Sequence, residues 1–324
     1  MTLRQTRSPR HRNRGLSLIE LMVSLVIGLV IMIAVVSAYI GASGATRVAE
    51  AQARMNEDAQ AVLTILTQQF RMAGNNPKRT NYDVATPRNP AYPTGTYIVR
   101  GCDGKFSNIS SATDIPSLAC GAGGGTAPDS IAISYEADRY NTVPTTGGSA
   151  TDCLGQVLPT RSGSANIWDG VSASVPGSVT FTVAENLFYV GTTTTIVSPS
   201  LYCKGNGGGT AQSLVENIED LQFVYGTAPA NTTPTSLAVA GYLGATAVQT
   251  PGTFVPALPN DAAQWAQVMT VRICVVVRSE RPVVSDAASA QYVKCDQTVD
   301  TTQSDLRLRR AYTTTVVLRN RIPS

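Results

Sequence analysis

The chain has 324 residues, of which 43% are hydrophobic and 15% charged, against roughly 25% charged residues in an average soluble domain. With 27 Gly and 18 Pro it is neither collagen-like nor wholly disordered. Its net charge of +3 comes from five arginines among the first fifteen residues, since the remainder has 20 basic and 22 acidic side chains, so a protein that coats nucleic acid is not supported. The single histidine, His11, lies in the same basic segment, which leaves no imidazole beyond it for a catalytic triad or a histidine-bound metal.

An apolar stretch follows the arginines. Residues 16–40 read LSLIELMVSLVIGLVIMIAVVSAYI and contain no proline. As a helix they would rise roughly 37 Å, more than the roughly 30 Å hydrocarbon core of a bilayer. The stretch also exceeds the apolar region of a secretory signal peptide, about 7 to 15 residues. The arginines before it predict a cytoplasmic N-terminus, with everything after Ile40 on the far side of the membrane.

The helical period continues beyond the apolar stretch, over residues 41–75. Apolar residues recur there at spacings of three and four and predict one buried stripe: Met55, Ala59, Val62, Leu66 and Phe70. The sequence Gly-Asn-Asn-Pro at 74–77 is typical of a helix end. We therefore expect one helix from Leu16 to about Ala73, with its second half packed on a soluble domain. Its glycines are the expected places for a bend: Gly28, Gly41 and Gly44.

Glu20 lies inside the apolar stretch. A charged group at the centre of a membrane helix costs about 2.5 to 3.5 kcal/mol on insertion scales, so an acid there is a functional candidate. One interpretation is local, because Ser17 and Glu20 have the spacing of a capping box at a helix start. The other is that Glu20 pairs with a cation supplied by a second subunit.

The segment from Arg14 to Leu21 (RGLSLIEL) resembles the processing signal of type IV pilins and type II secretion pseudopilins. The resemblance implies a leader peptide of residues 1–15, cut by prepilin peptidase between Gly15 and Leu16, and methylation of the new amino group of Leu16. Leucine departs from the phenylalanine usual at that position. The family's acid at the fifth mature position corresponds to Glu20, which favours pairing with the amine of a neighbouring subunit over a purely local cap.

Beyond residue 76 the sequence predicts a β-rich domain outside the cytoplasm. Residues 78–130 read as loops with a short possible strand at 96–100, and the turn-rich segments 205–210 and 227–259 read as surface excursions. Residues 268–277 have one wholly apolar face and predict a central strand. The other expected strands are 130–135, 178–183, 187–190, 221–225 and 312–318.

Six cysteines follow the apolar stretch. In an oxidising periplasm they can form up to three disulfides, with 15 possible connectivities. Pairing of neighbours in sequence is the arrangement we expect, which joins Cys102 to Cys120, Cys153 to Cys203 and Cys274 to Cys295. We expect no metal site, because the chain has no C-x-x-C pair and no histidine beyond the leader.

A second resemblance lies in the C-terminal half. Residues 214–226 (LVENIEDLQFVYG) resemble the helix-to-strand segment of minor pilins of the PilW family, and residues 271–281 and 308–321 fit the same pattern. The acids of this segment are expected on a solvated helix face rather than as calcium ligands: Glu216, Glu219 and Asp220. The basic residues near the C-terminus are expected on the polar face of a strand rather than on DNA: Arg307, Arg309, Arg310, Arg319 and Arg321.

The chain shows no G-x-S-x-G, P-loop, S-x-x-K or H-E-x-x-H motif, so we expect neither an enzyme nor a cofactor.

The two resemblances imply a pilin-like α+β fold: a leader (1–15), an assembly helix (16–40), its amphipathic continuation (41–75) and a disulfide-containing head (76–324). They imply a minor pilin, held in the inner membrane and then in the pilus, that primes or caps the fibre in motility and adhesion. The implied partners are prepilin peptidase, other minor pilins, the major pilin, the inner-membrane assembly platform and, as a further candidate, a tip adhesin. A type II secretion pseudopilin, a signal-anchored periplasmic binding protein and a DNA-uptake subunit remain as alternatives.

Overall fold

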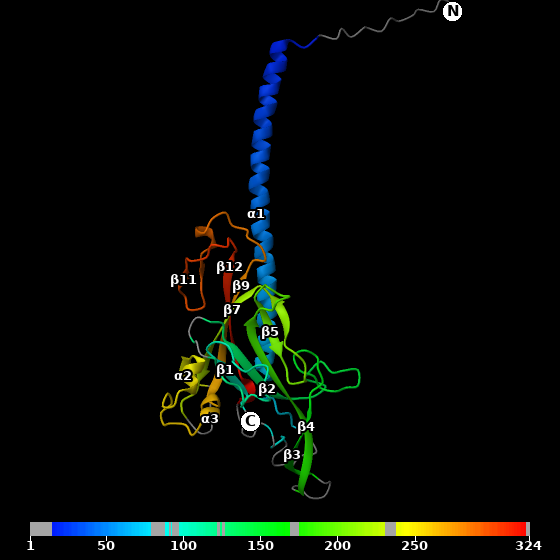
Figure 1. The fold of residues 1–324 in the computed structure, drawn as a ribbon, viewed down its shortest axis with the longest axis vertical. Helices are drawn as coiled ribbons and strands as arrows, with labels where there is room; N and C mark the ends of the chain where they lie inside the picture. Colours follow the sequence, from blue (N-terminus) through cyan, green and yellow to red (C-terminus); the bar gives the residue numbers. More distant parts are fainter. Residues whose placement is uncertain are drawn as a thin grey trace, which may run out of the picture. The chain divides into compact units, whose positions relative to one another are not determined.

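The computed structural model describes residues 15–78, 88–90, 92, 97–121, 124, 127–168, 175–230 and 238–321. Contacts group the chain into two compact units, Met1–Glu50 and Ala51–Ser324. One helix, α1, contributes to both units and runs from Leu18 to Met72 (Figure 1). The three glycines expected to bend it are all α-helical. The predicted long helix is therefore confirmed, and it begins two residues later and ends one residue earlier than expected.

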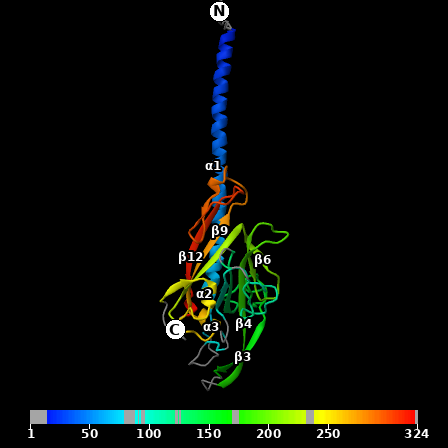
Figure 2. The ribbon, with the colours of Figure 1, turned by 60° about the vertical axis from the view of Figure 1, so that its left-hand side comes forward.

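Six antiparallel strands form the first sheet of the unit Ala51–Ser324. Their order is β1-β2-β4-β5-β6, and β3 pairs with the first part of β4. The bounds are β1 Val99–Cys102, β2 Ser130–Ala137, β3 Thr160–Ile167, β4 Val175–Gly191, β5 Ser200–Lys204 and β6 Gln212–Glu216. The ribbon of β3 and β4 extends past the C-terminal end of α1 in both views (Figures 1 and 2).

β4 joins two segments that the sequence predicts as separate strands, 178–183 and 187–190. No strand was predicted at the polar residues between them, but each has a partner that lets it stay in the strand. Glu185 pairs with Arg161 at 3.0 Å, and the Asn186 side chain donates to Gln69 of α1 at 2.8 Å. These partners come from other elements, so the local sequence gave no sign of them.

The second sheet has the order β12-β9-β7-β8. Its strands are β7 Ile218–Thr227, β8 Gly241–Leu243, β9 Val268–Arg278 and β12 Arg309–Val317. β9 lies between β7 and β12, as its apolar face predicts, and Val271, Ile273 and Val275 are fully buried. The fold is the expected α+β combination of one long helix and a β-rich head, and the strands of its sheets pair antiparallel.

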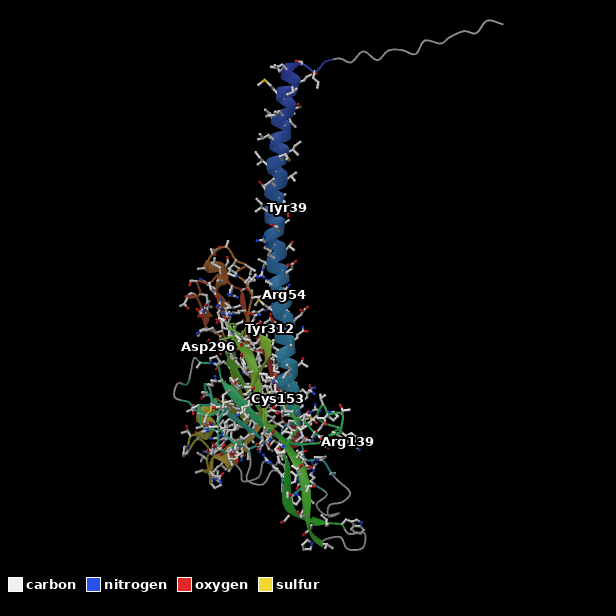
Figure 3. All side chains as sticks on the ribbon, turned by 45° about the vertical axis from the view of Figure 1, so that its right-hand side comes forward. Tyr39, Arg54, Arg139, Cys153, Asp296 and Tyr312 are labelled. Atoms are coloured by element: carbon white, nitrogen blue, oxygen red, sulfur yellow. A yellow bond between two sulfur atoms is a disulfide. The ribbon has the colours of Figure 1, made fainter. Side chains whose placement is uncertain are left out.

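The second half of α1 packs on this head through the predicted stripe, whose five members are at most 3% exposed. The ring of Phe70 meets that of Phe223 edge-on, with centroids 5.9 Å apart. Polar contacts lie beside the stripe: Tyr312 donates to the Asn56 side chain at 2.6 Å, and Arg54 pairs with Glu280 at 3.3 Å (Figure 3). The helix is thus an integral layer of the core from Met55 onward.

The predicted stop signal ends α1. Gly74 has φ of +70°, a conformation that glycine adopts without a steric penalty, and its N–H donates to the main-chain oxygen of Ser134 at 2.8 Å. The side chain of Asn320 donates to the free carbonyls of Arg71 and Ala73 at 3.0 and 3.1 Å. The far C-terminus therefore supplies a cap for a helix that the local sequence only terminates.

The segment 214–219 is not a helix, and this expectation was wrong. β6 ends at Glu216 and β7 begins at Ile218, so the chain passes from one sheet to the other at Asn217, whose φ is +63°. Asparagine tolerates this left-handed conformation better than most residues. Its side-chain oxygen accepts from Ser198 at 2.9 Å and its main-chain oxygen accepts from Arg278 at 3.0 Å.

The segment 227–259 is not only a surface excursion. In its described part, α2 (Ala245–Gln249) buries Val248 completely, and the Asp103 carboxylate accepts from the main-chain N–H groups of Ala245 and Thr246 at 2.7 and 2.8 Å. α3 (Asp261–Trp265) follows and buries Trp265 against Tyr225. The remaining elements are η1 Ala288–Ala290, β10 Tyr292–Val293, β11 Val299–Asp300 and η2 Arg319–Arg321.

Three disulfides cross-link the head: Cys102 to Cys120, Cys153 to Cys203 and Cys274 to Cys295. These are the pairs of neighbours in sequence, out of the 15 connectivities that six cysteines allow. Loop-closure entropy assigns about 3 to 4 kcal/mol of stabilisation to loops of these lengths. The first disulfide closes a loop without a strand of its own, whereas the second encloses β3 and β4.

A buried carboxylate joins the two sheets. Asp129 is 4% exposed, and its two oxygens accept from the N–H groups of Gly104 and Phe223 at 3.0 and 2.8 Å. Its own N–H donates to Leu221 of β7 at 2.6 Å. Burial raises the pKa of Asp129 to about 7, although the two amide donors act in the opposite direction.

We expect this pKa to make stability fall as pH rises from about 4 to about 7. In that window the folded chain keeps a proton that the unfolded chain has released from a carboxyl with an ordinary pKa of 3.8. An Asp129→Asn variant should lose this part of the slope in urea unfolding followed against pH. Asp305 provides an opposite control, because Arg309 holds its pKa at about 2, so Asp305→Asn should change the slope only below about pH 4. Equal slopes for Asp129→Asn and the unmodified chain between pH 4 and 7 would contradict the prediction.

Candidate assembly site

The first turn of α1 contains a capping box. The N–H of Ser17 donates to the Glu20 carboxylate at 3.0 Å, and the N–H of Ile19 donates to the Ser17 hydroxyl at 3.3 Å. The local interpretation of Glu20 is thus satisfied within a single chain. Glu20 is nevertheless exposed, so its carboxylate is open to a second partner.

Gly15 and Leu16 precede the helix in exposed, non-helical backbone. A Cβ built on Gly15 would have no atom within 4 Å, so neither packing nor backbone conformation requires glycine at this position. A residue type that the fold does not need is consistent with recognition by another protein. Residues 1–14 of the expected leader lie outside the described residues.

No residue that the structure describes packs against the apolar stretch of α1. Eighteen large hydrophobic side chains between Leu16 and Ile40 are 52% to 79% exposed. Among the described residues, α1 is the one helix long and apolar enough to cross a membrane. Exposed apolar surface on this scale indicates lipid or other helices as its natural surroundings.

The C-terminal arginines were expected on the polar face of a strand, and this was wrong for all but Arg310. Arg309 lies in β12 but is buried, and the other three lie outside that strand. The Arg309 side chain is 2% exposed and binds both Glu219 oxygens, at 2.6 and 3.1 Å, and Asp305 at 2.7 Å. Arg321 donates to the main-chain oxygen of Trp265 at 2.8 Å, and Arg307 donates to that of Ser279 at 2.8 Å. Glu219 is correspondingly an ion-pair partner and not part of a solvated helix face.

An exposed apolar helix that starts just after a glycine, carries one acid in its first turn and continues into a disulfide-bonded antiparallel head is the layout of a pilin. Comparison with known families agrees. Residues 10–36 match the prokaryotic N-terminal methylation motif, and residues 187–320 match Type IV Pilus-assembly protein W. Comparisons with curated proteins and with solved structures give no match.

The two matches support a type IV pilus minor pilin of the PilW family, as the resemblance in the sequence predicts. The second match contains the C-terminal end of β4 and all four strands of the second sheet, including the Asn217 crossover. Sequence reasoning missed the Arg309 ion-pair cluster. Glu219 and Arg309 lie in two segments that fit the PilW pattern, and Asp305 lies just before the second of them. These opposite charges in the two segments were the signal that could have predicted the cluster.

Proposed function

We propose that this minor pilin is a non-catalytic structural subunit of the type IV pilus that enters the fibre through α1. Prepilin peptidase cuts it after Gly15, and the new amino group of Leu16 is methylated. Before assembly the apolar half of α1 spans the inner membrane, with the leader in the cytoplasm and the head in the periplasm. The single observation that supports this most strongly is the run of eighteen exposed apolar side chains with Glu20 at its start.

The energetics of that helix limit where it can go. Each large apolar side chain transferred from lipid to water costs about 1.5 to 3 kcal/mol, so exposure of all eighteen would cost tens of kcal/mol. The helix therefore leaves the bilayer only for another apolar environment, which a bundle of similar helices provides. Within that bundle Glu20 needs a cation, and the amine of Leu16 on a neighbouring subunit supplies one.

A role in priming or at the tip of the fibre follows from the head. The β3–β4 ribbon extends past the C-terminal end of α1, where the next subunit along the helix direction would have to fit (Figures 1 and 2). A subunit placed last at that end meets no such obstruction. The proposed partners are the other minor pilins, the major pilin, the assembly platform and a tip adhesin.

Mass spectrometry of the N-terminal peptide from assembled pili tests the processing step. We expect a mature chain that starts at Leu16 with one added methyl group, and a Gly15→Val variant that stays full length and is absent from pili. Gly28→Val is the matched control, because a Cβ at Gly28 also has no atom within 4 Å but lies beyond the cleavage site. An uncut chain in pili would overturn the proposal. Loss of protein export with normal pili in a deletion strain would assign the chain to type II secretion instead.

A further inference from the structure

A cleft of about 620 Å³ lies over the first sheet, on the face opposite the core that contains α1. Its floor is apolar and comes from Leu187 and Tyr189 of β4 together with Ile109 and Leu118. Two segments form its walls: the loop closed by the first disulfide, and the glycine-rich turn 204–211 after β5. Clefts of about 300 to 1,000 Å³ with an apolar floor and a few polar groups are typical sites for small ligands.

Both walls are held in place. The disulfide between Cys102 and Cys120 closes the first wall, and the Asn108 side chain braces it by donating to Ser117 at 2.8 Å. In the second wall, the N–H of Gly207 donates to the Asp152 carboxylate at 3.0 Å, and that of Gly209 donates to the Gln156 side chain at 2.9 Å. A cleft with fixed walls loses little conformational entropy when it is filled.

The cleft is positively charged. The chain contains only four lysines, and two of them line this cleft, Lys105 from the first wall and Lys204 from the second. The ammonium group of Lys105 lies 4.7 Å from the centroid of the Tyr189 ring, and that of Lys204 donates to the main-chain oxygen of Ile109. Within the described part of the chain, neither lysine forms an ion pair with a carboxylate.

The two acids at the cleft do not cancel this charge. Glu185 is 2% exposed and already paired with Arg161 at 3.0 Å. Asp114 is exposed at the rim, where its carboxylate accepts from the N–H of Ser117 at 2.9 Å. The cleft therefore has two lysines and one acid without an ion-pair partner, and this net positive charge favours the binding of an anion.

The surroundings favour a sugar over an acidic peptide. The two strands beneath the cleft, β4 and β5, each have a hydrogen-bonded neighbour on both sides. Neither therefore offers an open edge with which a peptide main chain could pair. Hydroxyl side chains gather at the rim and can bond to sugar hydroxyls: Ser107, Ser110, Thr113 and Thr210. The apolar floor suits the non-polar face of a sugar ring.

We propose that this cleft binds an acidic sugar, a hexuronic acid unit of a glycan, whose carboxylate faces Lys105 and Lys204 and whose ring lies over the apolar floor between the two walls. The proposal gives the head a ligand of its own, and it does not depend on how the chain enters a fibre. A pilus subunit with such a cleft would contact acidic polysaccharide at a surface.

The test is calorimetric titration of the full chain in detergent with glucuronate and, as a neutral match, glucose. We expect glucuronate to bind at least tenfold more tightly than glucose, because a charge-assisted hydrogen bond is lost with the carboxylate. Lys105→Met together with Lys204→Met should weaken glucuronate binding at least tenfold. Lys294→Met, which removes a lysine outside the cleft, should leave it unchanged.

The proposal would be overturned if glucose bound as tightly as glucuronate. It would also be overturned if Lys294→Met weakened glucuronate binding as much as the double variant does. Inorganic phosphate and tetraglutamate are titrated in parallel, and binding of either as tightly as glucuronate would also overturn it, by showing a bare anion site or a peptide site. Because Lys204 also bonds the opposite wall, the single variant Lys105→Met is measured separately. It should fold with an unchanged near-ultraviolet circular dichroism spectrum and lose at least threefold in affinity for glucuronate.

Discussion

Glu20→Gln is expected to leave membrane insertion and cleavage intact and to lower the amount of this protein in purified pili at least tenfold. Glutamine keeps an oxygen that can accept the Ser17 N–H, so the cap at the start of α1 survives. It has no charge, so it cannot neutralise the amine of a neighbouring subunit in the apolar bundle. Loss of an interaction worth about 1.4 kcal/mol lowers an equilibrium constant tenfold. Removing one charge from a buried ion pair costs more than this, about 3 to 5 kcal/mol. Quantitative immunoblots of pili against membranes give the ratio.

Two further variants separate the charge from the cap. Ser17→Ala removes the hydroxyl that accepts the Ile19 N–H and keeps the carboxylate, so it should cost helix stability of about 1 kcal/mol and leave incorporation unchanged. Glu50→Gln changes an exposed acid further along the same helix and should also be neutral. Normal incorporation of Glu20→Gln, or a defect of similar size in Ser17→Ala, would show that Glu20 acts only as a cap.

Phe70→Ala is expected to destabilise the head by about 3 to 5 kcal/mol, the usual range when a buried phenylalanine is truncated. Phe70 is fully buried between α1 and the second sheet, in edge-on contact with Phe223. Its removal leaves a cavity at the point where the helix and β7 meet. Urea unfolding of the full chain in detergent, followed by the fluorescence of the buried Trp265, measures the loss.

Gln68→Ala is the matched control for this experiment. Gln68 lies two residues before Phe70 on the exposed side of α1, so the substitution should change the free energy of unfolding by less than about 0.5 kcal/mol. If Phe70→Ala cost no more than Gln68→Ala, the helix would not be part of the hydrophobic core of the head.

The helix was predictable because its signals are local. Spacing alone placed Met55, Val62 and Phe70 on one buried stripe, and the glycine at position 74 marked the end. The apolar face of β9 was equally readable, because alternation along a strand directly reports which side is buried. The resemblance of the segment from Arg14 to Leu21 to a pilin processing signal indicated the pilin class.

Features that depend on distant partners were not predictable in this way. The continuity of β4 through Glu185 relies on Arg161, and the crossover at Asn217 relies on a strand more than fifty residues further along the chain. Arg309 reads as a surface residue in a polar strand until Glu219 and Asp305 are placed against it.

The amino-acid sequence by itself determined that this protein has a membrane-length helix with one acid near its start, an amphipathic continuation and a β-rich head, because hydrophobic period and residue type act over a few neighbouring positions. Only the tertiary structure decided which strands merge, where the chain changes sheets, which arginines are buried and which two lysines share a cleft. Those outcomes depend on contacts between residues far apart in the chain, and pairing across such distances is set by the packing of the whole head.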